Sequence, residues 1–190
     1  LSQADTSKVR GYLEMIESAS LRARNLSRGI WNFAKAEPGT VSDINVVELL
    51  DSVQHLTAPA VKVAQIDVSR LEDSSSIDEA ISHADSALAQ QILVELVLSA
   101  PESIPGGGLV VWQVSKSNDG STEIDLLTEP WNEDPTAEWK IPEYVRESFK
   151  DMGGTIADAV PTPVKSQTSE TDEELTGWRI IATLPPASSD

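Results

Sequence analysis

The sequence predicts an α+β protein in which a long coiled-coil-type helix precedes a compact domain with helices on one face of a mixed sheet. Residues 1–37 carry apolar side chains at seven-residue spacing, which is typical of helices packed along their length. From residue 40 to residue 187, short β-type segments alternate with apolar helical ones. Hydrophobic residues make up 39% of the 190 residues, which is enough for a packed core.

The first predicted element is a helix that ends near Lys35, because Pro38-Gly39 stops it. Its apolar residues define a seam of heptad a and d positions. A lone helix cannot bury such a seam, so we expect a homodimer through this helix or a partner helix from sequence upstream. The seam residues are Val9, Tyr12, Ile16, Ala19, Ala23, Leu26, Ile30 and Phe33.

Residues 41–100 are predicted to alternate between strands and helices. Proline punctuates both helices, inside the first at Pro59 and after the second at Pro101. The predicted elements are a strand at Val41–Val46, a helix at Glu48–Lys62, strands at Ile66–Val68 and Ser76–Ser82, and an apolar helix at Ala87–Ala100.

The rest of the chain is predicted to form further strands and one more helix. Asn118-Asp119-Gly120 is a hairpin signal, and Gly153-Gly154 closes the helix. The elements are strands at Leu109–Val114 and Thr122–Leu127, a helix at Pro142–Asp151, strands at Thr155–Val160 and Trp178–Leu184, and a mobile loop at Thr162–Gly177.

Composition excludes several classes of function. The chain has 14 Lys and Arg against 31 Asp and Glu, so its net charge of −17 disfavours nucleic acids and anionic membranes. Without cysteine it has no disulfide, thiolate metal site or thiol nucleophile. No apolar run approaches the roughly 18 residues of a membrane span, and no signal peptide is recognisable. We expect a soluble, cytoplasmic segment without nucleic-acid or membrane contact.

Chemistry-bearing motifs are few. No Lys-Ser/Thr follows Gly106–Gly108, which makes a phosphate loop improbable. His55 and His83 are interpreted as surface or half-buried histidines. Glu95 and Asp125 could form a carboxylate pair, but a helix-edge position and an outward strand position favour structural roles. No catalytic residue and no metal site is assigned.

Four stretches, in this order, resemble one family. They are LEMIESASLRARNLSRGIWNFAK (residues 13–35), SHADSALAQQILVELVLSAPESIPGGGLVVWQV (82–114), YVRESFKDMGGTI (144–156) and GWRIIATLP (177–185). Together they resemble the histidine kinases of two-component signalling. The resemblance implies that residues 1–37 are the second helix of a dimerisation hairpin. It also implies that residues 40–187 are an ATPase-like domain, a Bergerat-like α/β sandwich.

The resemblance also implies that the ATP chemistry is degenerate. Glu95 and Ser99 stand where the pocket helix of the family carries asparagines, the second of which holds Mg²⁺; in gyrase and Hsp90 a glutamate at the first position activates water. Thr128-Glu-Pro130-Trp131-Asn132 replaces the Asp-x-Gly-x-Gly that binds adenine, and Asp134–Lys140 lacks the glycines of the lid. We therefore expect no cofactor.

The expected function is that of a pseudo-histidine-kinase or histidine-phosphotransferase-like module that docks a response regulator. The phosphoacceptor histidine would lie upstream of Leu1. On the first helix, Arg28 and Trp31 lie off the seam and are predicted to contact the regulator, while Ile16 and Leu26 hold the dimer. Two alternatives remain open: an active ATP-dependent sensor histidine kinase with an atypical pocket, and a non-catalytic dimeric interaction scaffold.

Overall fold

The computed structural model describes residues 9–10, 12–13, 16, 39–71, 80–131, 137–165 and 174–188. The described residues before residue 39 are helical and exposed; the side chains of Val9, Tyr12, Leu13 and Ile16 are 52–63% exposed. Most of the predicted first helix, including Leu26, Arg28 and Trp31, lies outside the described residues. The long coiled-coil helix therefore stays a prediction.

A six-stranded sheet forms the base of the domain. Its order is β2-β4-β5-β8-β6, and β7 also pairs with β8. Only the β2–β4 pairing is parallel, so the sheet is mixed as predicted. The strands are β2 (Ile66–Arg70), β4 (Gly108–Lys116), β5 (Thr122–Pro130), β6 (Thr155–Ile156), β7 (Val160–Lys165) and β8 (Glu174–Leu184).

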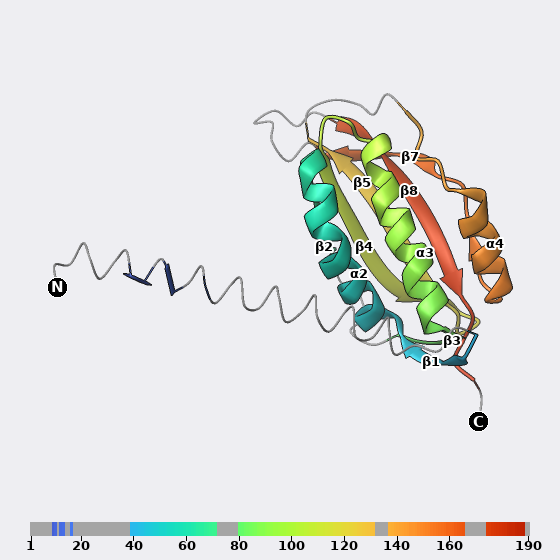
Figure 1. Ribbon diagram of the computed structural model, residues 1–190. Helices are drawn as coiled ribbons and strands as arrows, with labels where there is room; N and C mark the ends of the chain where they lie inside the picture. Colours follow the sequence, from blue (N-terminus) through green and yellow to red (C-terminus); the bar gives the residue numbers. More distant parts are fainter. Residues whose placement is uncertain are drawn as a thin grey trace.

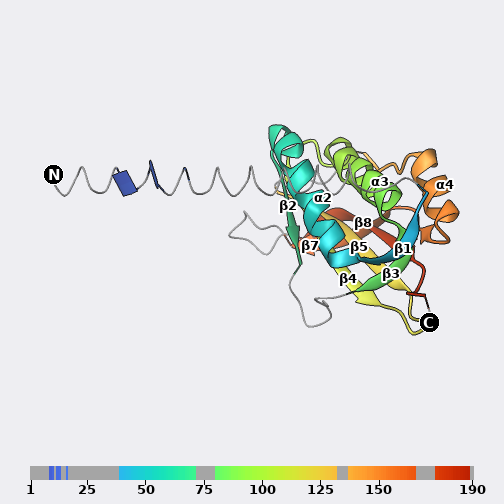
Figure 2. The same cartoon turned by 60° about the horizontal axis from the view of Figure 1, so that its bottom comes forward.

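Three helices cover one face of this sheet: α2 (Val46–Val61), α3 (Ser86–Ser99) and α4 (Glu143–Asp151) (Figure 1). Viewed from below, the helices form a layer above the strands (Figure 2). Two of them begin at side-chain caps, since Asn45 and Asp85 each accept hydrogen bonds from the backbone N–H groups of the second and third residues that follow. None of the helices formed by the described residues is long and apolar enough to cross a membrane.

A second, two-stranded sheet lies at one end of the helical layer. It pairs β1 (Val41–Asn45) with β3 (Ile81–Asp85) in antiparallel register, and Asp43 lies opposite His83. Each of these strands runs directly into a helix, β1 into α2 and β3 into α3. The two-stranded sheet therefore fixes where both helices begin.

The core lies between the helices and the six-stranded sheet. Its largest fully buried side chains include Trp112 from β4, Phe149 from α4 and Trp139 from the segment before α4. Burying one such aromatic side chain contributes several kcal/mol to stability. Trp112 and Trp139 are therefore core residues.

Several predicted boundaries are wrong. Strand β3 spans Ile81–Asp85, where the sequence predicted Ser76–Ser82, because its register is set by pairing with β1 and its end by the Asp85 cap. His83 accordingly lies in the middle of a strand. In β5 the ladder continues to Pro130, three residues beyond the predicted end at Leu127.

The predicted loop at Thr162–Gly177 is also partly wrong. Strand β7 begins at Val160 and pairs with β8 from Glu174 onward, so both ends of the predicted loop are strand. Pro163 favoured the loop interpretation. An edge strand tolerates prolines at alternate positions, however, because every second N–H points away from the partner strand. The strand predicted at Thr155–Val160 is divided into β6 and the start of β7.

Candidate functional site

The candidate site is the face of α3 that carries Glu95 and Ser99. These positions are four residues apart, so their side chains lie on the same side of the helix. Both interact with the chain around α4: Ser99 with Trp139, and Glu95 with Tyr144. The structure therefore places an aromatic side chain against each of the two sequence-predicted positions.

The Ser99 hydroxyl joins two segments. Its Oγ donates to the Leu96 carbonyl at 2.7 Å and accepts from Trp139 Nε1 at 2.8 Å. The indole of Trp139 is 1% exposed, so its N–H is satisfied by Ser99 in a buried setting. The contact of Trp139 with Ser99 was not predicted, since the two residues are 40 positions apart and no local pattern links them.

Glu95 makes a different kind of contact. Its carboxylate interacts with the Tyr144 phenol, whose pKa is raised first by burial, then by the hydrogen bond to Glu95 and by the charge of Glu95. The Tyr144 side chain is 47% exposed, so this end of the face is open to solvent. The face thus has a sealed end at Ser99 and a solvent-facing end at Glu95.

Glu95 and Asp125 do not form a carboxylate pair. Ile124 and Leu126 of β5 are buried in the core under the helices, so Asp125 between them faces the other side of the sheet. There it binds Arg179 of β8 through two guanidinium nitrogens, with distances of 2.5 Å from Nη2 and 3.0 Å from Nε. The sheet lies between the two carboxylates, which excludes shared acid–base chemistry.

The sheet continues beyond the predicted end of β5. Thr128 is fully buried, and its Oγ1 accepts from Trp178 N at 2.8 Å. Pro130, which lies beyond the predicted strand end at Leu127, is a ladder residue opposite Gly108. A Cβ on Gly177 would lie 2.0 Å from the Thr128 carbonyl oxygen, so the backbone packs closely around this strand end. Thr128 to Pro130 therefore belong to the sheet.

No group of three or more metal-ligating side chains occurs within the part of the chain that the structure describes.

Solved histidine kinases share this arrangement of helices over a mixed sheet. The nucleotide-free catalytic domain of ThkA aligns over 79% of this chain and 99% of its own, with a TM-score of 0.54 and 13% identity. The chain has the fold of a histidine-kinase catalytic domain. This finding confirms the predicted Bergerat-like α/β sandwich. No protein-family model and no curated protein matches the chain.

Two larger histidine kinases also match this histidine-kinase fold. Full-length ShkA in complex with AMPPNP aligns over 95% of this chain at 17% identity and a TM-score of 0.56. ThkA in complex with the response regulator TrrA aligns over 98% of this chain at 17% identity and a TM-score of 0.50. This chain spans 39% of the ShkA chain and 53% of that ThkA chain.

Proposed function

We propose that the chain is a two-component signalling module with a histidine-kinase fold that does not bind ATP and that docks the receiver domain of a response regulator. In this proposal it acts as a pseudo-kinase or histidine phosphotransferase. The phosphoacceptor histidine lies on a segment outside residues 1–190, and the module is a homodimer through its first helix.

The contact between Trp139 and Ser99 carries the proposal. The resemblance to histidine kinases implies that Mg²⁺ is held at the Ser99 position by the side chain of an asparagine. Here the buried indole of Trp139 lies against that position, and its N–H donates a hydrogen bond to Ser99 Oγ. Removing a buried tryptophan from a core costs about 3–5 kcal/mol, and every 1.4 kcal/mol is tenfold in affinity. A nucleotide that displaced the indole would therefore lose at least about 100-fold in affinity.

Receiver docking and the dimer are each supported by one observation. ThkA, which shares this fold, has been solved with a response regulator bound. The described seam residues Val9, Tyr12 and Ile16 are more than half exposed in the single chain, as expected for a helix whose partner belongs to another copy. The first observation supports receiver docking, and the second supports a dimer through the first helix.

One observation favours an alternative, an ATP-dependent kinase with an atypical pocket. ShkA, which shares this fold, has been solved with AMPPNP. Glu95 is half-buried and lies at the solvent-facing end of the site, where a carboxylate could still activate water.

Calorimetry with ATP and Mg²⁺ separates the two proposals. We expect no binding tighter than about millimolar, because the indole occupies the site. Trp139→Ala, which removes the indole, serves as the matched variant, and a gain of affinity in it would support the steric explanation. A micromolar dissociation constant for the unmodified chain would contradict our proposal and favour the active kinase.

A further inference from the structure

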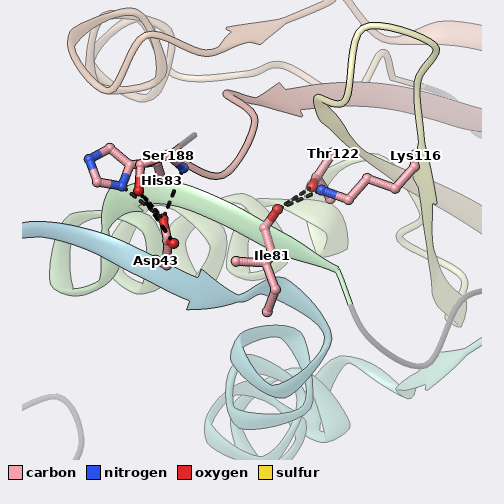
Figure 3. A network of polar contacts seen from close by, with 6 residues as sticks. All are labelled: Asp43, Ile81, His83, Lys116, Thr122 and Ser188. Atoms are coloured by element: carbon pink, nitrogen blue, oxygen red, sulfur yellow. Dashed lines mark hydrogen bonds and ion pairs between the residues drawn. The ribbon is translucent and has the colours of Figure 1, made fainter. Parts of the chain in front are cut away.

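His83 is held by a carboxylate on the neighbouring strand. Its Nδ1 lies 2.9 Å from Asp43 Oδ1, across the β1–β3 pair (Figure 3). The C-terminal segment holds the same carboxylate, since Ser188 donates its backbone N–H to Oδ1 at 3.2 Å and its hydroxyl lies 3.4 Å from that oxygen. Asp43 thus joins three segments and orients one imidazole.

The contact decides which nitrogen of His83 can react. The pKa of Asp43 is lowered, first by the hydrogen bond from His83 and then by the backbone N–H of Ser188, so the group is ionised at neutral pH. An ionised carboxylate only accepts, so the neutral imidazole of His83 places its proton on Nδ1 and its lone pair on Nε2. The side chain is 41% exposed, and Figure 3 shows Nε2 pointing away from the other labelled residues.

Hydrogen bonds join strand β3, which carries His83, to strands β4 and β5 of the six-stranded sheet. Ser82 Oγ donates to Thr122 Oγ1 of β5 at 2.6 Å. Lys116 Nζ of β4 donates to the Ile81 carbonyl at 2.5 Å (Figure 3). A reactive side chain on a rigid strand, oriented by its own partner, needs little reorganisation to react.

We propose that His83 is a second phosphoryl-accepting histidine, additional to the one that the proposed function places outside residues 1–190, with Nε2 as the attacking atom and Asp43 as the positioning residue. The Nε2 lone pair forms the N–P bond while the P–O bond of an acyl phosphate breaks, and the carboxylate of the donor leaves with the bonding electrons. The Asp43 charge stabilises the imidazolium that forms, while the proton stays between Nδ1 and Oδ1. That the natural donor is a receiver aspartyl phosphate rests on the proposed function; the acceptor chemistry rests on His83 and Asp43 alone.

The other histidine of the chain is a matched control. His55 is exposed on α2, and its Nδ1 lies 2.6 Å from the backbone carbonyl oxygen of Asp51. It therefore has the same tautomer and a free Nε2, but a neutral partner replaces the carboxylate. A higher labelling rate at His83 than at His55 would therefore measure the effect of the Asp43 charge and of the fixed strand.

The experiment treats the chain with acetyl phosphate, which is an acyl phosphate, and follows the incorporation of acid-labile phosphate by mass spectrometry and ³¹P NMR. We expect one phosphoryl group in the unmodified chain, none in His83→Gln, and an unchanged rate in His55→Gln. Since both histidines are exposed, melting temperatures should stay equal, which would show that loss of labelling is not unfolding.

Asp43 is tested by its charge. Asp43→Asn keeps an acceptor for Nδ1 and should slow labelling roughly tenfold or more, by analogy with metal-binding histidines, in which loss of the orienting partner costs about 10–100-fold. Asp43→Glu should restore part of the rate, which a purely structural role would not produce. Labelling of His83→Gln at the unmodified rate, or Asp43→Asn without effect, would overturn the proposal. Neither result would change the outcome of the ATP calorimetry, so the two proposals can fail independently.

Discussion

At the scale of single residues, Ser99 shows how one hydroxyl changes what a helix face can do. A serine that accepts from a buried indole and donates to its own helix has no proton left to donate and only part of its acceptor capacity. The Ser99 hydroxyl therefore takes part in hydrogen bonds within the protein. Glu95, four residues earlier, contacts Tyr144, whose side chain is about half exposed, so this end of the face is open to solvent.

Trp139→Ala should lower the free energy of unfolding by about 3–5 kcal/mol, because it leaves a large cavity against α3. Ser99→Ala should cost about 1–3 kcal/mol, because it leaves the indole N–H buried without a partner. Urea titration monitored by circular dichroism measures both. Tyr144→Phe, on the exposed end of the face, is the control and should change stability by less than about 0.5 kcal/mol. Equal, small effects for all three variants would show that the indole does not seal the site.

The site could be predicted from the sequence only in part. Glu95 and Ser99 were located because both lie within one helix, where a spacing of four residues fixes a common face. Trp139 could not be assigned to them, because its contact depends on how the segment before α4 returns to α3. The His83–Asp43 pair was missed for the same reason: the two residues are 40 positions apart, and their contact is created by strand register.

At the scale of elements, local signals predicted the helices and misplaced some strands. Apolar periodicity predicted α2, α3 and α4 to within about two residues of their ends. The last strands were misplaced because their partners are distant, and the prolines of β7 concealed a strand that β8 stabilises. Helix α2 continues through Pro59 to Val61, so the predicted disturbance does not end it. Pairing energy from a neighbour outweighs local propensity in these segments.

The first helix supplies the element-scale prediction. Ile16→Glu and Leu26→Glu each place a charge in the seam and should convert the dimer to a monomer, because an unpaired charge in an apolar interface costs several kcal/mol. Multi-angle light scattering measures the mass of each variant. Glu17→Lys, off the seam, is the control and should leave the mass unchanged. If both seam variants keep the mass of the unmodified chain, the seam is not the dimer interface.

At the scale of the whole molecule, Asp85 joins the segment before β1 to the domain. One carboxylate oxygen caps α3 through the N–H groups of Ala87 and Leu88, and the other accepts from Gly39 N at 2.6 Å. Gly39 has a φ of 86°, a left-handed conformation that favours glycine. The Asp85 carboxylate therefore holds both the start of α3 and the segment that precedes β1. The proposed function assigns nucleotide-site degeneration to α3 and receiver binding to the helix before β1.

That division of tasks gives the last prediction, which concerns where a receiver domain binds. If function resides in the first helix, Trp31→Ala and Arg28→Glu should weaken receiver binding, because they remove a large aromatic contact and reverse a charge. Glu95→Ala and Ser99→Ala should leave it unchanged, because their side chains face α4 and the segment before it. Titrating a fluorescent receiver domain against each variant measures the dissociation constants. Loss of binding in Glu95→Ala with full binding in Trp31→Ala would place the docking surface on the α3–α4 side, and the first helix would then serve assembly alone.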